Sequence, residues 1–206
     1  MRARDPGKSR QAILSAAEAE FAEKGFFGTR VDEIAAAAQI NKRMIYAYFG
    51  DKEGLYKQVL FQVYARMETV EQSLVASGHS GKQLICEIIN AYFDFLYENP
   101  TFVKILMWEN LNEGRYLKTL ESSRIERGTI QHFVEDIERG KSSGIFRKDI
   151  DSWHTVLSLI TSCFANFSNQ YTLSKLFGRN LTDQKFIEER KQYTTDMLIA
   201  YLCNKD

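Results

Sequence analysis

Residues 25–57 read GFFGTRVDEIAAAAQINKRMIYAYFGDKEGLYK, and this stretch decides the fold of the chain. Apolar residues recur at helical spacing between positions 31 and 38, which predicts one short helix there. Residues 39–41 leave room only for a tight turn, and a second helix of two turns is predicted over 42–49. Two short helices joined in this way form a helix-turn-helix, which places its second helix in the major groove of DNA.

The second predicted helix carries its own start and stop signals. Asn41 is a favoured N-cap, and Gly50 is typical of the residue that follows the last helical turn. Ile45 and Phe49 are four residues apart, so they share the face that packs inward. The other side chains of residues 42–48 are therefore expected to face solvent, fully or in part.

The outward side chains have the chemistry of a DNA-reading surface. Lysine and arginine can reach phosphates and guanine edges, and tyrosine hydroxyls can donate to phosphate oxygens. We expect Lys42, Arg43, Met44 and Ala47 to meet base edges, with Met44 against a thymine methyl group. A corner inside an ordinary helical bundle would share the spacing, so spacing alone does not separate the two. The predicted DNA-contact set is Thr29, Arg30, Asn41, Lys42, Arg43, Met44, Tyr46, Ala47, Tyr48 and Lys52.

The identity of particular residues favours DNA binding over a corner inside an ordinary helical bundle. The stretch closely resembles the DNA-binding domain of the TetR family of bacterial transcriptional regulators, over roughly residues 8–60. The resemblance implies a ligand-responsive regulator, and a repressor before an activator. It would bind a palindromic double-stranded operator as a homodimer and be released by a small-molecule effector of unknown identity. The matching residues are Thr29-Arg30-Val31, Ile34-Ala35, Ile40-Asn41-Lys42, Ile45-Tyr46, Tyr48-Phe49, Asp51-Lys52-Glu53 and Leu55.

Composition and periodicity indicate an all-α protein. The 206 residues include two prolines, 44% are hydrophobic, and no stretch alternates strictly enough to predict a sheet. The predicted organisation is a three-helix DNA-binding domain over 1–52, with a basic arm at 1–8, and a helical effector-binding and dimerisation domain over 53–206. About nine helices are predicted, near 9–24, 31–38, 42–49, 51–76, 82–98, 101–113, 116–140, 149–171 and 183–203.

The formal net charge is zero, yet the first ten residues hold Arg2, Arg4, Lys8 and Arg10 against Asp5 alone. A basic footprint confined to the tail and the recognition helix suits a small DNA contact. The three cysteines form no CxxC pair, so we expect them to be reduced and buried. No apolar run approaches transmembrane length and the N-terminus has no signal-peptide core, which predicts a cytoplasmic protein without a membrane partner.

Two of the later helices carry wide apolar surfaces. The 149–171 segment is apolar nearly all round, so it must be covered on more than one face. The last helix supplies a second wide apolar surface, and both could simply belong to the core. The family resemblance implies instead a four-helix interface with a second subunit, made by Trp153, Val156, Leu157, Ile160, Phe164, Tyr193, Met197 and Tyr201.

Aromatic residues are concentrated in the part of the chain after the DNA-binding domain. Aromatic side chains are good pocket walls, and a few polar groups among them can orient a ligand, although each could equally be a core residue. Together with the resemblance, this favours a neutral or weakly polar aromatic or lipophilic effector. The predicted pocket residues are Phe93, Tyr97, Phe102, Met107, Trp108, Asn110, Phe133, Phe164, Phe167 and Gln170.

Two other functions compete with a ligand-responsive regulator. A helical enzyme is disfavoured because the three histidines lie in different segments and no Glu-x-x-His pair exists. Gly140-Lys141-Ser142 imitates the end of a phosphate-binding loop, but Glu135 stands where the opening glycine belongs. We therefore predict no catalytic residue, metal ion or cofactor. The second alternative keeps DNA binding and gives the body a protein partner instead of a small molecule.

Overall fold

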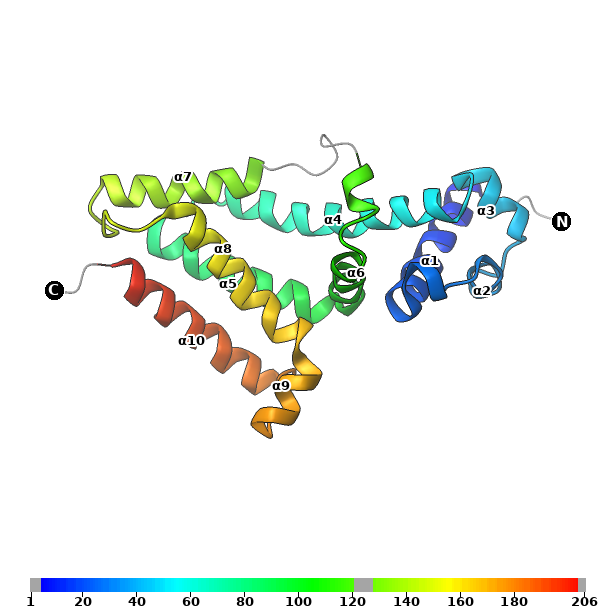
Figure 1. The fold of residues 1–206 in the computed structure, drawn as a ribbon. Helices are drawn as coiled ribbons and strands as arrows, with labels where there is room; N and C mark the ends of the chain where they lie inside the picture. Colours follow the sequence, from blue (N-terminus) through cyan, green and yellow to red (C-terminus); the bar gives the residue numbers. More distant parts are fainter. Residues whose placement is uncertain (1–4, 121–127, 204–206) are drawn as a thin grey trace. The chain divides into compact units, whose positions relative to one another are not determined.

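The structure of the protein is a computed structural model, which describes residues 5–120 and 128–203. Ten α-helices and one short 3₁₀-helix account for the regular structure of these residues, and none of them lies in a strand (Figure 1). The all-α prediction is confirmed. Arg2 and Arg4 of the predicted basic arm lie outside the described residues. Because Pro6 already opens the first helix, capped by Asp5, the helix begins earlier than the predicted arm allowed.

The chain packs into two units rather than dividing once along the sequence. The head unit comprises Met1–Arg66 and Thr101–Ile125, and the body unit comprises Met67–Pro100 and Glu126–Asp206. The long helix α4 (Lys52–Ala76) contributes to both. These units differ from the predicted boundary after residue 52, because the first half of α4 and the segment after Pro100 pack with the N-terminal helices.

The N-terminal part of the head unit contains α1 (Pro6–Gly28), α2 (Val31–Ala37) and α3 (Lys42–Phe49). The helix predicted to stop at Gly25 leaves helical geometry there, with φ 67° and ψ 176°. Apolar side chains from these helices and from α4 form the head core. Its fully buried members include Ile13, Leu14, Ala17, Phe21, Ile34, Ile45, Leu55 and Val59.

Helix α6 (Pro100–Leu111) completes the head unit. The Trp108 indole donates from Nε1 to the Ala22 carbonyl at 3.2 Å, and Thr101 donates its hydroxyl to the Glu18 carboxylate at 2.5 Å. Arg66 of α4 binds the same Glu18 carboxylate at 2.6 Å. These contacts between residues more than 40 positions apart hold α6 and α4 against α1.

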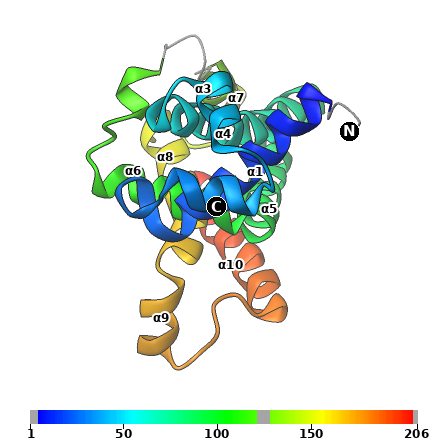
Figure 2. The same cartoon turned by 90° about the vertical axis from the view of Figure 1, so that its right-hand side faces the viewer.

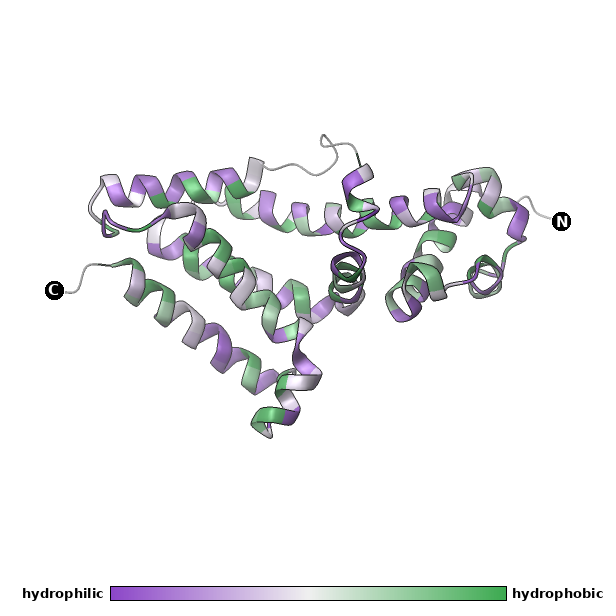
Figure 3. Cartoon of the chain, in the orientation of Figure 1, coloured by the Kyte–Doolittle hydropathy of each residue, from purple (hydrophilic) through white to green (hydrophobic). Residues whose placement is uncertain are grey.

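The body unit is built on α5 (Gly81–Glu98), α7 (Gly128–Ser142), α8 (Ser152–Ser168) and α10 (Gln184–Leu202). Helix α8 packs on α5 and α7, and α10 packs on α5. Figure 3 shows α8 hydrophobic along most of its length, as expected for a helix covered on several faces. A buried Glu71 carboxylate on α4 accepts hydrogen bonds from the hydroxyls of Tyr92 on α5 and Thr129 on α7, which ties three helices together.

Two predicted helices are shorter than the sequence pattern indicated. The helix expected over 116–140 is replaced by a 3₁₀ turn at Leu117–Thr119 and by α7, which begins at Gly128; residues 121–127 lie outside the described part. The helix expected over 149–171 ends at Ser168, and Asn169 separates it from α9 (Gln170–Phe177). Helix α9 has no buried residue and projects from the end of α8, which is seen most clearly in Figure 2 (compare Figure 1).

The cysteine expectation is only partly met. All three cysteines are free, as predicted, and Cys163 is buried, but Cys86 and Cys203 are half-buried. Within the described ranges, none of the helices has the length and the apolar character that crossing a bilayer requires.

Candidate nucleic-acid interface

The second helix of the helix-turn-helix, α3, is anchored by two side chains and otherwise faces outward. The Asn41 side chain caps it by accepting a hydrogen bond from the Arg43 backbone N–H at 2.9 Å. Ile45 and Phe49 are its only buried residues. Gly50 ends the helix with φ 78°, a left-handed conformation that favours glycine. The predicted helix, its cap and its inward face are all found in the structure.

The side chains predicted to contact DNA have unequal exposure on α3. Arg43, Tyr46 and Ala47 are exposed, whereas Lys42, Met44 and Tyr48 are half-buried. Asn41 is also exposed, but its side-chain oxygen is already engaged as the helix cap. The exposed side chains thus offer a guanidinium, a phenol hydroxyl and a methyl group, which suit guanine edges, phosphates and thymine methyl groups respectively.

Thr29 does not lie where a phosphate contact requires it. Its side chain is 2% exposed, and its hydroxyl donates to the backbone carbonyls of Gly25 at 2.8 Å and Glu20 at 3.0 Å. The hydroxyl therefore fixes the bend between α1 and α2, and we withdraw Thr29 as a DNA contact. Arg30, which follows it, is exposed and is the N-cap residue of α2, with its backbone N–H donating to the Glu33 carboxylate at 3.2 Å.

The cations of the helix-turn-helix differ in how they are compensated. Lys42 forms an ion pair with Asp32 of α2, with Nζ 2.8 Å from Oδ1 and 2.9 Å from Oδ2. The hydrogen bond to Asp32 raises the pKa of Lys42. The Lys52 ammonium lies 4.6 Å from the centre of the Phe26 ring, and burial lowers its pKa. Arg43 has no ion pair with any residue in the described ranges.

The sequence interpretation missed two partners of these cations. Asp32 lies in the first turn of α2, and its carboxylate lies beside Lys42. The Phe26 ring lies under Lys52, contacts Tyr56 edge to face and lies tilted against Tyr116. The sequence does place an acidic residue ten positions before Lys42. Whether the two side chains meet depends on the angle between α2 and α3, which the sequence spacing does not give.

The predicted pocket residues are divided between the two units. In the body unit, Phe93 and Phe167 are buried and contact each other edge to face, with ring centres 5.7 Å apart. Phe133 lines a small apolar cavity of about 10 Å³ between α5, α7 and α8, room for no more than one water. Phe164 and Gln170 are half-buried, whereas Tyr97 is exposed.

The other four predicted pocket residues lie on α6 in the head unit. Phe102 is buried, and the centre of its ring lies 6.1 Å from the centre of the Tyr64 ring. Trp108 is half-buried against α1, whereas Met107 and Asn110 are exposed. The structure thus gives Trp108 a packing role in the head that the prediction did not include.

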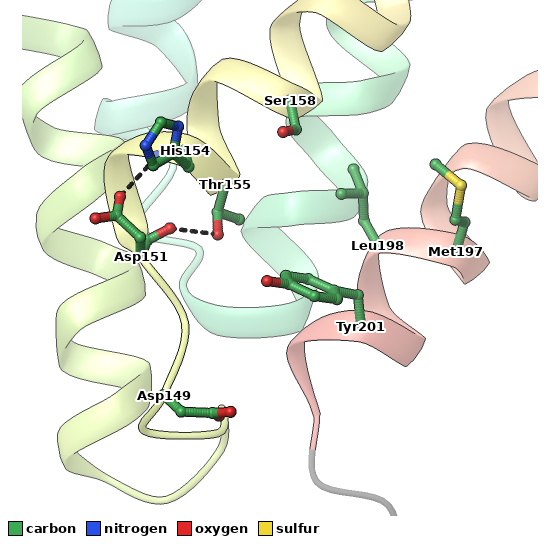
Figure 4. A pocket seen from close by; sticks show the side chains of 8 residues that line it. All are labelled: Asp149, Asp151, His154, Thr155, Ser158, Met197, Leu198 and Tyr201. Atoms are coloured by element: carbon green, nitrogen blue, oxygen red, sulfur yellow. Dashed lines mark hydrogen bonds between the residues drawn. The ribbon is translucent and has the colours of Figure 1, made fainter.

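A cleft of about 520 Å³ opens between α8 and α10 in the body unit. Thr155 and Ser158 of α8 lie on one side, and Leu198 and Tyr201 of α10 lie on the other (Figure 4). Asp151 accepts hydrogen bonds from the His154 backbone N–H and, through its own carbonyl, from the Thr155 hydroxyl. None of the ten predicted pocket residues lines this cleft. Met197 and Tyr201, which do line it, belong to the predicted subunit interface.

That predicted interface is largely unpacked in the single chain. Large apolar side chains of α8 and α10 stay exposed, between 45% and 63% of their surface. Ile160 and Phe164 are half-buried, and Val156 is buried at 3% against its own chain, so its place is the body core. The exposed members are Trp153, Leu157, Tyr193, Met197 and Tyr201, which we call the α8/α10 face.

A capped recognition helix that presents arginine, tyrosine and alanine to solvent, carried on an all-helical chain, defines a helix-turn-helix transcription regulator. Residues 13–59 match the family model described as "Bacterial regulatory proteins, tetR family", and residues 82–198 match "Tetracyclin repressor-like, C-terminal domain". The chain belongs to the TetR family of bacterial transcriptional regulators.

Known proteins of this family resemble the chain over almost its whole length. The HTH-type transcriptional repressor NicS of Pseudomonas putida is 32% identical over 203 residues, which cover 98% of this chain and 96% of NicS. A tetR-family regulatory protein from Rhodococcus RHA1 has the same fold, with a TM-score of 0.72 at 18% identity over 96% of this chain and 98% of that one. FadR of Bacillus subtilis, solved with stearoyl-CoA, aligns at a TM-score of 0.68 and 16% identity over 93% and 98% of the chains.

Proposed function

We propose that this regulator is a repressor that binds a palindromic operator as a homodimer and leaves it when a small molecule binds. The observation that carries the proposal is the exposed surface of α3, held in place by its own cap and by two buried anchors. Its relative NicS is named a transcriptional repressor, which supports repression over activation. A regulator that occupies an operator blocks transcription until its effector favours a conformation that does not fit the DNA.

The DNA contacts divide between base reading and positioning. Arg43 reads a guanine edge through its guanidinium fork, and Met44 and Ala47 lie against base edges or a thymine methyl group. Tyr46 and Tyr48 donate their hydroxyls to phosphates, as the cations Arg30 and Lys52 also do through their charge. Positioning contacts of this kind fix the register of α3 in the groove without specifying sequence.

The α8/α10 face supports the homodimer. A patch of large exposed apolar side chains on two adjacent helices is costly in water, and burying it against its own copy removes that cost. Two chains related by a two-fold axis present two recognition helices. They would read half-sites one helical turn apart, ~34–36 Å, on a palindromic site.

The effector site is expected in the body core around Phe93, Phe133 and Phe167. Buried aromatic rings there provide an apolar wall for a neutral or weakly polar aromatic or lipophilic molecule. The FadR structure was solved with stearoyl-CoA, a ligand with a long acyl chain, which supports a lipophilic effector for this fold. Because the cavity at Phe133 is small, binding requires the surrounding helices to move apart.

The proposal is tested in two experiments on the purified full chain. Selection of binding duplexes from a random DNA pool should return a palindrome whose half-sites are about ten base pairs apart. A selected motif without two-fold symmetry would contradict the dimeric mode. A thermal-shift screen with fatty acids, acyl-CoA esters, steroids and aromatic acids should then return a stabilising compound that also releases the selected duplex. Stabilisation without release would refute the effector part alone.

A further inference from the structure

The ion pair between Asp32 and Lys42 lies within the helix-turn-helix itself. Asp32 stands in the first turn of α2 and Lys42 is the first residue of α3, and both carboxylate oxygens contact the ammonium at 2.8 and 2.9 Å. The Asp32 side chain is 72% exposed. The Lys42 ammonium also lies 6.0 Å from the centre of the Tyr46 ring. The Lys42 ammonium therefore has contacts with residues of both α2 and α3.

The consequence for DNA follows from charge. Affinity for DNA of arbitrary sequence comes almost entirely from cations that neutralise phosphates. An ammonium already paired with a carboxylate must give up that partner before it neutralises a phosphate. An exposed carboxylate beside the proposed reading helix also repels DNA phosphates that come near it. Arg43, its neighbour on α3, has no such partner among the described residues.

We propose that Asp32 is a specificity-determining residue, because its carboxylate withholds the Lys42 ammonium from DNA phosphates and so limits binding to DNA of arbitrary sequence. On the operator, contacts of Arg43, Met44 and Ala47 with bases fix the register of α3, and affinity depends little on Lys42. On other DNA the head can shift along the duplex until a released ammonium meets a phosphate. This inference rests on the proposed DNA-binding surface and adds a residue that restrains it.

The test uses Asp32→Asn, which keeps the shape of the side chain and removes its charge. The probe is a random-sequence duplex of about 30 base pairs. Binding to it is measured by fluorescence anisotropy at KCl concentrations from about 50 to 200 mM. The variant should bind this duplex several-fold more tightly than the unmodified protein. The slope of log K against log salt should steepen by about 0.9 for each recognition helix that contacts DNA. Affinity for the selected operator should change less, so the ratio of operator affinity to random-duplex affinity falls.

Two further variants separate the mechanism from its alternatives. Glu135→Gln on α7 removes one exposed negative charge outside the head unit and should leave the slope unchanged. Asp32→Asn combined with Lys42→Gln should bind as Lys42→Gln does, because the gain depends on the released ammonium.

A double variant that keeps the gain would show that Asp32 acts only by repelling phosphates, and would overturn the Lys42 mechanism. An Asp32→Asn protein that matches the unmodified protein on the random duplex would overturn it as well. Failure of the unmodified protein to bind either duplex would instead remove the proposed DNA-binding function. Circular dichroism checks that each variant is folded, as expected for a 72% exposed Asp32 side chain and a half-buried Lys42.

Discussion

The indole of Trp108 lies so close to Gly25 that a Cβ atom at residue 25 would be 2.8 Å from the indole Cδ2 atom. Gly25 also has φ 67° and ψ 176°, a combination that essentially only glycine adopts. The two residues are 83 positions apart, and their contact joins α6 to the end of α1 within the head unit. The bend that leads into the helix-turn-helix is thus shaped by a residue outside the predicted DNA-binding domain.

Gly25→Ala is expected to destabilise the protein by roughly 2–6 kcal/mol. Backbone strain supplies roughly 1–3 kcal/mol, and the clash with Trp108 supplies a similar amount. Gly50→Ala is the matched control, since Gly50 also has a positive φ but a Cβ there meets no atom within 4 Å. The control should lose only the strain part, roughly 1–3 kcal/mol. Urea unfolding followed by circular dichroism measures both, and equal losses would contradict the steric role of Trp108.

Arg43→Ala and Lys52→Ala are expected to affect DNA binding differently. The first removes the proposed base contact, so it should cost about 1–3 kcal/mol on the operator and relax the preference at the base pair that Arg43 would read. The second removes the proposed phosphate contact, so it should weaken binding to all sequences alike and reduce the salt slope by about 1 for each bound chain. Competition binding with operator and random duplexes separates the two effects. Identical behaviour of the variants would refute the division of roles.

Leu157→Glu is expected to weaken the homodimer. The side chain is 56% exposed in the single chain, and a carboxylate at that position would be buried without a partner in the dimer. We expect at least a tenfold rise in the dimer dissociation constant, about 1.4 kcal/mol, measured by analytical ultracentrifugation. Leu111→Glu on α6 changes an equally apolar, 73% exposed side chain outside the α8/α10 face and should leave the dimer intact. A monomeric unmodified protein would contradict the homodimer outright.

Folding stability is expected to fall in alkaline solution. Burial raises the pKa of the Cys163 thiol from 9.0 to about 12 and that of the Tyr64 phenol from 10.0 to about 12. Because the unfolded chain releases these protons at lower pH, the stability is full below about pH 9 and decreases as pH rises toward 12. Urea unfolding at several pH values between about 8 and 11 measures the decrease. A free energy of unfolding that stays constant over this range would contradict it.

The helix-turn-helix could be predicted from sequence because its signals are local. The cap at Asn41, the anchors Ile45 and Phe49 and the stop at Gly50 all lie within ten residues of one another. Each specifies geometry through contacts along the chain, so the structure follows the pattern closely.

The rest depended on contacts between distant residues. Leu117 donates its backbone N–H to the Glu109 carboxylate at 3.0 Å, and the Tyr116 ring packs on Phe26, so a 3₁₀ turn forms where periodicity predicted a long helix. The hydroxyl of Thr29 donates to the Gly25 backbone carbonyl, although the position of Thr29 in the motif predicted a phosphate contact. Neither contact changes the spacing of apolar residues, which is all that a periodicity argument can detect.

The recognition helix depends on the protein interior through only two of its eight residues, Ile45 and Phe49. Exchanging the exposed Arg43 and Ala47, and the half-buried Met44, for other side chains would therefore keep both buried anchors of α3 in place. This makes target preference and structural integrity separable properties of the same short helix. Regulators redirected to new promoters could therefore be sought by altering these three codons, with the rest of the chain left as it is.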